Sequence, residues 1–593
     1  MTDYKPIKMT EDTHPNLPDQ KALEKEIGDY LSRKYGDRIK IVSAGLFPQS
    51  EEDNNSGRSA DEEKTLAFNF DLKPEELVAY LDEYVIKQDW AKAVLATKVC
   101  THFNRIRFLQ ERQREDKQTL GRVKNNILLI GPTGAGKTFL VKLIADRLGV
   151  PFVKGDATKF SETGYVGGDV EDLVRDLVRA ADDDIARAQY GIIYVDEIDK
   201  IAHHAGRGGL DVSRSGVQRA LLKPMEETEV DLKVPHDMIS QLEAMEHYRT
   251  TGKRKKRLVN TKNILFIMSG AFDGLTEIVH RRLHRKTIGF AGELVGEKPA
   301  AESMGLARAE DLVAFGFESE FIGRLPITVA LEQLNEEDLT AILMNVNCAL
   351  LIAKCQDFMV YGIKLAFEDE ALAVIARLAV QQNTGARGLV SVVENVLLPF
   401  EKTLPSTNIK FLAVTAAMVQ DPHKELQNLL NSAKRRDFHR RHFGRIKKKQ
   451  LKRLTEFFKV KNEEYLAGNG MALSPARLTL LAEYTFSENI DPSRACDDFL
   501  QLVNHITSWQ DKIFKQCGVR VKFDEEAVNY CLAQEPRTPE GIDVICSKLL
   551  KAAEYGLMLL EHEKHPGEIT IPAMGMAEPE KFINRVVEEK LKL

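Results

Sequence analysis

One glycine-rich segment constrains the fold more than any other part of the sequence. It consists of Gly131, Pro132, Thr133, Gly134, Ala135, Gly136, Lys137 and Thr138. The apolar run NNILLIG leads into it, and FLVKLIADRLG, which has helical spacing, follows. In a strand–turn–helix of this kind, glycines let backbone N–H groups converge on phosphate oxygens, and the helix N-terminus favours negative charge. The segment therefore predicts a nucleotide phosphate site, in which Lys137 reaches the β- and γ-phosphates and Thr138 binds Mg²⁺.

A second motif supplies the carboxylates that such a site needs. The run GIIYV ends in Asp196 and Glu197. Asp196 is expected at the carboxyl end of a strand, where ligands bind in open α/β sheets, and can hold Mg²⁺ through water. Glu197 can polarise the attacking water as a general base. A DE pair after a strand is by itself more often a solvated turn, but a P-loop about 60 residues upstream favours the nucleotide interpretation. ATP and Mg²⁺ are the predicted cofactors.

The order of apolar strands and helical segments predicts the fold class. Helical segments alternate with the strands ILLIG, GIIYV and NILFIM, which indicates an α/β domain with a mostly parallel sheet. After Pro326 the chain becomes largely helical, and no second P-loop occurs. The predicted parts are a small N-terminal module (1–48), an acidic linker (49–65), a P-loop large domain (66–330), a helical small domain (331–420), and a basic linker with a mostly helical extension (421–593).

Composition excludes several other classes of protein. The 593 residues carry a net charge of −6, which argues against a whole-chain nucleic-acid binder. No apolar stretch reaches the roughly 18 residues that span a membrane, and the N-terminus lacks the apolar core of a secretory signal. The seven cysteines form no CxxC pair, which argues against a zinc ribbon. We therefore expect a cytoplasmic protein without membrane contact.

With both motifs in place, the chain resembles the ClpX protein unfoldases over roughly residues 74–405. The motifs SGAFDGL (269–275), FESEFIGRLP, which ends at Pro326, and TGARGL (384–389) occur in the order of that family. The HslU unfoldases share the GYVG segment, but SGAFDGL and GARGL fit ClpX better. The resemblance implies an AAA+ ATPase that acts as a homo-hexamer.

The resemblance also assigns roles to residues outside the two motifs. Val85 and Ile86 correspond to adenine contacts, although the family usually has glycine where this chain has Lys87. Arg324 resembles the arginine finger, which reaches the γ-phosphate bound by a neighbouring subunit. Arg387 resembles the sensor-2 arginine, and Ser269 stands nearest to the sensor-1 position.

Two loops correspond to those that handle protein substrates and partners. Tyr165 and Val166 lie between glycines in GYVG, where the tyrosine ring can grip a peptide without reading its sequence. Ile288, Gly289 and Phe290 match the loop with which ClpX docks onto the ClpP peptidase, although these apolar side chains could instead pack internally. The basic run KRKKR (253–257) would attract acidic substrate ends or be a solvated loop.

The resemblance predicts an ATP-dependent unfoldase that threads protein substrates through a hexameric pore and delivers them to a ClpP-type peptidase. No protease motif stands out, so no intrinsic protease activity is expected. One alternative is a stand-alone remodelling chaperone. A less favoured alternative is a nucleic-acid-associated motor that uses the stretch 434–453. This stretch contains eleven Lys or Arg residues and one Asp.

Two departures from the family limit what can be carried over. The first 99 residues contain no cysteine, so we expect no four-cysteine zinc domain of the kind usual in ClpX in this part of the chain. The extension is the second departure, and it contains internal echoes: YGIKLAFEDEAL (361–372) resembles CGVRVKFDEEAV (517–528), and a fainter echo spans 470–503. These echoes predict degenerate copies of the small domain, the last of which lacks a counterpart of Arg387. Chance similarity between amphipathic helices is the alternative.

Overall fold

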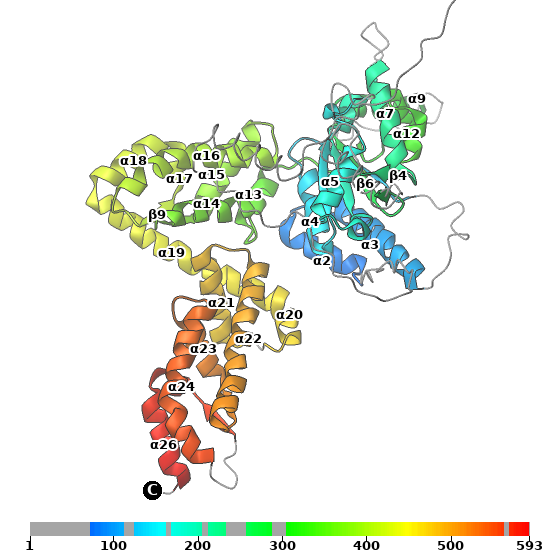
Figure 1. The fold of residues 1–593 in the computed structure, drawn as a ribbon. Helices are drawn as coiled ribbons and strands as arrows, with labels where there is room; N and C mark the ends of the chain where they lie inside the picture. The colour runs from blue at the N-terminus through cyan, green and yellow to red at the C-terminus, as the bar shows by residue number, and fades with distance from the viewer. Residues whose placement is uncertain are drawn as a thin grey trace, which may run out of the picture. The chain divides into compact units, whose positions relative to one another are not determined.

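The computed structural model describes most of the chain from residue 71 onward (Figure 1). The described ranges are 71–111, 124–161, 168–203, 212–232, 257–286, 304–471, 473–561 and 568–591. All of them belong to one compact unit, Leu66–Leu593. The predicted N-terminal module (1–48) and acidic linker (49–65) lie outside these ranges. We define the large domain as ending at residue 330, the small domain as residues 331–431, and the extension as residues 432–591.

The large domain is built on a five-stranded parallel sheet in the order β2-β3-β6-β1-β7. Its strands are β1 (Ile127–Ile130), β2 (Phe152–Asp156), β3 (Ile192–Asp196), β6 (Leu265–Gly270) and β7 (Ile327–Ala330). Every residue of β1 is buried, as expected for a central parallel strand covered on both faces. The predicted parallel α/β fold is therefore confirmed, and all five carboxyl ends meet at one edge.

Helices cover both faces of this sheet. They are α2 (Pro74–Tyr84), α3 (Asp89–Glu111), α4 (Lys137–Leu148), α5 (Asp172–Ala180), α6 (Ile185–Ala188), α7 (Val212–Met225), α9 (Leu275–Lys286), α11 (Ala309–Phe315) and α12 (Ser319–Gly323). Short 3₁₀ turns (Ala157–Lys159, Ile198–Ile201) and an antiparallel hairpin, β4 (Glu229–Asp231) with β5 (Leu258–Asn260), complete the domain.

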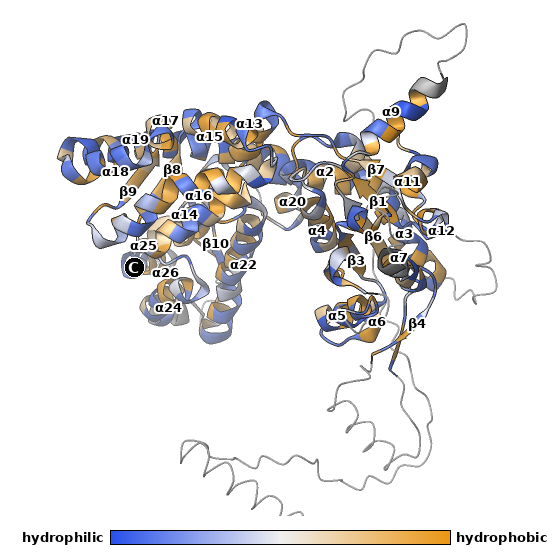
Figure 2. Cartoon of the chain, turned by 90° about the horizontal axis from the view of Figure 1, so that it is seen from above, coloured by the Kyte–Doolittle hydropathy of each residue, from blue (hydrophilic) through white to orange (hydrophobic). Residues whose placement is uncertain are grey.

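Strand alternation divides the interior of the large domain into two cores. Ile127 and Leu129 pack with α2, α3 and α4, whereas Leu128 and Ile130 pack with α5 and α7. Successive residues of a strand point to opposite faces, so one four-residue strand contributes to both cores. Figure 2 shows the hydrophobic colouring of the sheet strands. This packing fixes β1 between β6 and β7, and the loop that follows β1 starts from this buried strand.

The small domain combines helices with a two-stranded parallel ladder. Its elements are α13 (Glu336–Met344), α14 (Ala349–Val360), β8 (Lys364–Phe367), α15 (Asp369–Gln381), α16 (Ala386–Thr403), the 3₁₀ turn Leu404–Ser406, β9 (Phe411–Val414), α17 (Ala416–Gln420) and α18 (Pro422–Asn431). Strands β8 and β9 pair in parallel. The core continues past the predicted end at residue 420, because Leu426 and Leu429 of α18 belong to it.

Among the described helices, no single one is long and apolar enough to cross a membrane. The pair α13 and α14, which is bent by 47° at the break between the helices, reaches that length and apolar composition only when both helices are taken together. Leu339 and Leu343 of α13 and Phe358 of α14 lie in the core of the small domain.

The extension forms a separate core and repeats the element order of the small domain. Its elements are α19 (Ala433–Phe457), the short π-helix Phe458–Asn462, α20 (Glu463–Gly468), α21 (Pro475–Glu488), α22 (Pro492–Cys517), β10 (Val521–Phe523), α23 (Glu525–Ala533), α24 (Pro539–Glu561), β11 (Ile569–Ile571), α25 (Ala573–Ala577) and α26 (Pro579–Leu591). From α22 to α26 the order helix, strand, two helices, strand, two helices matches that from α14 to α18.

The two strand pairs are also alike. Strands β10 and β11 pair in parallel, as β8 and β9 do. The shared order and pairing support the predicted duplication of the small domain. The fainter echo at 470–503 contributes α21 and the start of α22 and has, among its described residues, no strand.

Helix α19 contains the basic stretch 434–453 and packs along β9 (Figure 1). Its Phe443 and Ile446 are buried against Ala366 and Ala413 of the small-domain strands. Several of its charges have partners in the small domain. Arg453 donates two hydrogen bonds to Asp369, at 3.0 and 2.7 Å, and Lys449 pairs with the same carboxylate. Part of the positive charge therefore fastens the extension to the small domain.

We expect Phe499→Ala to destabilise the extension alone. Phe499 is 1% exposed in α22, and a buried Phe→Ala change costs about 3–5 kcal/mol. The buried residues of the extension core all lie at or after Leu454 in the chain. Hydrogen exchange should show lost protection in 458–591 and unchanged protection in the sheet of the large domain. Val460→Ala, at a site 77% exposed in the same part of the chain, is the matched control. Equal loss of protection in β1 and β3 would contradict separate cores.

Candidate nucleotide-binding site

A cavity of about 350 Å³ lies at the carboxyl edge of the sheet. Its lining comprises Thr133, Gly134, Gly136, Lys137, Thr138, Phe139, Asp196, Glu197, Asp199, Lys200, Gly270, Ala271, Asp273, Ala386, Arg387 and Val390. These residues come from the loop after β1, the ends of β3 and β6, and the start of α16. Parallel strands bring their carboxyl ends to the same edge, which is where ligands bind in such sheets. The structure thus brings the two sequence motifs and Arg387 to one cavity.

The loop after β1 depends on glycine at two positions. Gly134 and Gly136 have φ angles of 79° and 94°, which residues with a Cβ rarely adopt. A Cβ on Gly134 would lie 2.1 Å from the carbonyl oxygen of Thr384 in the small domain. Ala386 N donates a 3.0 Å hydrogen bond to Gly134 O across the same contact. The glycines therefore permit both the turn and the close approach of the small domain.

The helix that follows this loop presents positive charge to the cavity. Helix α4 begins at Lys137 without a side-chain cap, which leaves its first N–H groups for an anion. Lys137 Nζ donates to the carbonyl oxygens of Gly131 (2.6 Å) and Pro132 (3.1 Å). Burial lowers the pKa of Lys137, and the Asp196 carboxylate partly opposes this effect. Arg387 adds a second cation from the small domain, so the lining suits a polyphosphate.

Asp196 is held by a short hydrogen-bonded network. Ser269 Oγ donates to Asp196 Oδ1 at 2.6 Å and lies 2.6 Å from the hydroxyl of Tyr194. Thr138 Oγ1 lies 3.4 Å from Asp196 Oδ2 and 3.1 Å from the Tyr194 hydroxyl. Ser269 itself is fully buried, below the cavity rather than in its lining. The network orients the carboxylate toward Thr138.

The electrostatics of Asp196 favour the ionised form. Burial alone would raise the pKa of Asp196, but hydrogen bonds from Ser269 and Lys154 lower it overall. Lys154 Nζ lies 3.0 Å from Asp196 Oδ2. An ionised carboxylate beside a threonine hydroxyl is the kind of oxygen donor set that Mg²⁺ prefers. The residues present therefore fit a Mg²⁺ ion held by Asp196 and Thr138.

Glu197 stands at the edge of the cavity in an unusual backbone conformation. Its φ of 58° lies in the left-handed region, which costs a non-glycine residue of order 1–3 kcal/mol and is concentrated at functional sites. Among the described residues, the Glu197 carboxylate has no hydrogen-bond or ion-pair partner, although its backbone N–H donates to Asp196 Oδ1 at 3.1 Å. The carboxylate is therefore free to accept a proton from a water molecule in the cavity.

Arg324 does not border the cavity of its own chain. It caps the C-terminus of α12, and its side chain is about half exposed and pairs with Glu226. Asn126 Nδ2 donates a 3.1 Å hydrogen bond to Arg324 O, which fixes the backbone there. An arginine that is held in place, exposed and outside its own site is suited to a site on another molecule.

The remaining predicted residues lie elsewhere or outside the described ranges. Val85 is buried at the end of α2 and Ile86 is half-buried, and neither borders the cavity. Tyr165 and Val166 fall in 162–167, and Ile288, Gly289 and Phe290 fall in 287–303; both segments lie outside the described residues, as does most of KRKKR.

Sequence reasoning missed two residues of the site, Tyr194 and Lys154. Tyr194 carries a hydroxyl within the otherwise apolar run GIIYV, and burial raises its pKa to about 12. A buried tyrosine usually finds a partner for its hydroxyl, so this residue could have been singled out. Lys154 offered no such signal, because its contact with Asp196 joins two different strands.

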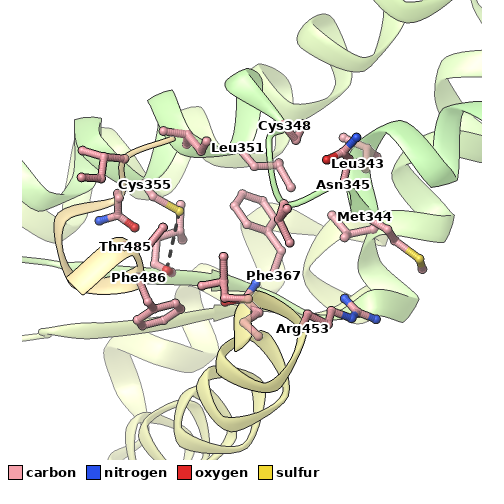
Figure 3. Close-up of a pocket in the computed structure, with 18 residues that line it drawn as sticks. Leu343, Met344, Asn345, Cys348, Leu351, Cys355, Phe367, Arg453, Thr485 and Phe486 are labelled. Atoms are coloured by element: carbon pink, nitrogen blue, oxygen red, sulfur yellow. Dashed lines mark hydrogen bonds between the residues drawn. The ribbon is translucent and has the colours of Figure 1, made fainter. Parts of the chain in front are cut away.

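A second cavity, of about 110 Å³, lies between the small domain and the extension (Figure 3). Its lining is mainly apolar and includes Leu351, Phe367 and Phe486. Its polar groups include Cys355 Sγ, which donates to Leu365 O at 3.7 Å, and Arg453, which binds Asp369. Because its lining is mainly apolar, we interpret this cavity as a packing space at a domain junction rather than as a candidate site.

We expect Ser269→Ala to weaken Mg²⁺-dependent nucleotide binding about tenfold, because loss of one buried hydrogen bond to a charged group costs roughly 1–3 kcal/mol. Ser269→Thr, which keeps a hydroxyl, is the matched control. Removing the donor should also raise the pKa of Asp196 from its lowered value. As the pH falls, the variant should therefore lose binding at a higher pH than the parent. Titration calorimetry at several pH values measures both effects, and identical pH profiles would contradict the network.

Comparisons with known proteins agree with this geometry. A family model described as AAA domain (Cdc48 subfamily) matches residues 122–328, and one described as the C-terminal, D2-small domain of ClpB protein matches residues 334–400. The relative named ATP-dependent Clp protease ATP-binding subunit ClpX, from Treponema denticola, is 42% identical over 337 residues, which cover 56% of this chain and 77% of that protein. The chain therefore belongs to the ClpX family of AAA+ ATPases.

Proposed function

We propose that this protein is an ATP-dependent unfoldase that works as a homo-hexamer and threads protein substrates through a central pore. The observation that carries the proposal is the single cavity that joins Lys137, Asp196, Glu197 and Arg387. Two domains contribute to it, so nucleotide bound there would contact both. Hydrolysis could then change how the small domain packs on the loop at Gly134 and Ala386, where the two domains meet.

Five residues of the cavity lining have proposed roles in hydrolysis: Lys137, Thr138, Asp196, Glu197 and Arg387. Lys137 and the N-terminus of α4 bind the phosphates, while Thr138 and Asp196 hold Mg²⁺. Bound Mg²⁺ would neutralise charge on the phosphate oxygens. Glu197 orients a water molecule and accepts its proton. Arg387 contacts the phosphates from the small domain, which makes the site sensitive to domain position.

Arg324 supports the hexameric part of the proposal. Its guanidinium is accessible and lies outside the cavity of its own chain. In a ring, each such arginine would reach the γ-phosphate held by a neighbouring subunit and stabilise the charge that develops there. The pair with Glu226 would hold it ready for that contact.

The substrate and partner assignments rest on the loops. Tyr165 and Val166 would grip the substrate in the pore, and Ile288–Phe290 would dock on a ClpP-type peptidase. The charges of α19 that bind Asp369 are not available to phosphate groups, which weighs against a nucleic-acid motor. A remodelling chaperone without a peptidase remains the second candidate.

We expect Tyr165→Ala to abolish unfolding of a stable tagged protein while ATP hydrolysis continues, because the substitution removes the grip and spares the cavity. Glu197→Gln is the companion variant: it should bind ATP and hydrolyse it at least about a hundredfold more slowly, the lower range for loss of a general base. Fluorescence loss of a tagged green fluorescent substrate and phosphate release measure the two activities. Equal unfolding by Tyr165→Ala and parent would remove the pore assignment.

We expect deletion of Ile288–Phe290 to leave ATP hydrolysis and unfolding intact and to abolish degradation when ClpP from the same source is added. Six loops on one ring face would bind jointly even if each contact were weak. Replacing the three residues by Ser-Gly-Ser keeps the loop length and serves as the second variant. Co-sedimentation with ATP present tests the complex directly. If the parent forms no complex with ClpP, the chaperone becomes the better proposal.

A further inference from the structure

Two consecutive residues, Lys87 and Gln88, hold the turn between α2 and α3 in a strained conformation. Their φ angles are 61° and 65°, in the left-handed region that disfavours residues with a Cβ. Strain of this kind persists only where surrounding contacts impose it. Both side chains make those contacts with one connector segment, residues 331–338, which follows β7 and includes the first turn of α13.

Gln88 fixes the start of this connector. Its side chain is 2% exposed, its Nε2 donates to Glu332 O at 2.8 Å, and its Oε1 accepts from Glu332 N at 2.8 Å. The NH₂ group and the oxygen of the Gln88 side-chain amide thus both form hydrogen bonds with the backbone of Glu332. Removing them would leave buried backbone groups unpaired, which makes Gln88 a poor position for a functional test.

Lys87 holds the other end of the connector. Its ammonium donates to Gln333 O at 3.1 Å and lies 3.0 Å from Asp338 Oδ2 and 3.4 Å from Glu332 Oε2. Asp338 Oδ2 also accepts from Asn335 N at 2.9 Å, in the capping box that begins α13. The ammonium of Lys87 therefore forms an ion pair with the Asp338 carboxylate, which belongs to the capping box of α13, the first helix of the small domain. Its side chain is 28% exposed, so it can be replaced without opening a core.

The connector runs beside the loop that would bind phosphate. Leu331 N donates to Ile130 O at 2.7 Å, and a Cβ on Gly131 would lie 2.9 Å from Leu331 O. The small domain meets the same loop a second time, where Ala386 N donates to Gly134 O just before Arg387. Movement of the connector at the first contact would therefore shift the second contact and the arginine next to it.

We propose that Lys87 is a positioning residue, which fastens the connector to the large domain and thereby places Arg387 over the phosphate end of the cavity. The proposal deepens, and rests on, the proposed ATP-dependent function. Glycine at position 87 would adopt the left-handed conformation without cost, but it would have no side chain to make this attachment. The strained turn and the lysine contacts therefore occur together at one residue.

The test measures ATP hydrolysis by Lys87→Ala, alone and combined with Arg387→Ala. Alone, we expect Lys87→Ala to lower kcat/KM about tenfold, within the usual range for coupling between two sites. In the Arg387→Ala background, the same change should cost less than about twofold, because residues that act as a unit are not additive. Lys87→Arg, which keeps the positive charge toward Asp338 and Glu332, should lose less activity than Lys87→Ala.

Two further variants separate positioning from stability. Lys87→Gly removes the attachment together with the backbone strain, so its melting temperature should not fall below that of the parent, although its activity should fall as far as that of Lys87→Ala. Arg377→Ala removes an exposed ion pair with Glu336, which lies on α13 like Asp338. Both partners of this pair belong to the small domain, so the variant should hydrolyse ATP like the parent. Parental activity in Lys87→Gly, or full additivity with Arg387→Ala, would overturn the proposal.

Hydrogen exchange keeps the test independent of the proposed function. Residues 335–344 should lose protection in Lys87→Ala and keep it in Arg377→Ala. If the parent hydrolyses no ATP, the proposed function fails, while the exchange result still decides whether Lys87 fastens α13. Unchanged exchange in Lys87→Ala would show that Lys87 does not fasten the connector.

Discussion

The contact between the glycine-rich loop and the small domain is the constraint on which the site depends. Gly134 lacks a Cβ, and the carbonyl of Thr384 occupies the space that a Cβ would fill. Because the two backbones approach so closely, α16 begins at the cavity and carries Arg387 into its lining. The cavity is therefore shared by two domains, and its shape depends on how they pack. A residue larger than glycine would separate them.

The polar groups around Asp196 show a second dependence, between strands. Tyr194 and Asp196 lie on β3 and Ser269 on β6, and the parallel pairing of these strands brings their side chains together. Hydrogen bonds to the ionised form keep the pKa of Asp196 low despite burial. The strands of the buried core thus hold the ionised Asp196 carboxylate at the edge of the sheet, where it can bind a divalent cation.

The extension repeats the strand pairing and the helix order of the small domain. The parallel pair β10 and β11 repeats β8 and β9, with helices in the same order around it. By element order, α24 corresponds to α16, and its first residues, Pro539, Glu540 and Gly541, include no arginine like Arg387 at the start of α16. Helix α19 joins the two parts, burying Phe443 and Ile446 and placing Arg453 on Asp369. The stretch 434–453, which the sequence predicts to be a basic linker, is part of α19 in the structure, and its Lys449 and Arg453 attach the extension to the small domain at Asp369.

The sequence by itself determined the parts that are local in the chain. The P-loop and the DE pair after GIIYV are short motifs whose residues are neighbours in the chain. The alternation of strands and helices is likewise visible as local patterns, so the parallel α/β fold and a phosphate site at the carboxyl ends of its strands could be predicted. The roles of Tyr165 and of Ile288–Phe290 stay predictions. Only the tertiary structure decided that Ser269 and Tyr194 bond to one another near Asp196, that Val85 and Ile86 do not border the phosphate cavity, and that Lys87 reaches Asp338. These contacts join residues far apart in the chain, and their geometry follows from packing that spans whole domains, which no local pattern of residues encodes.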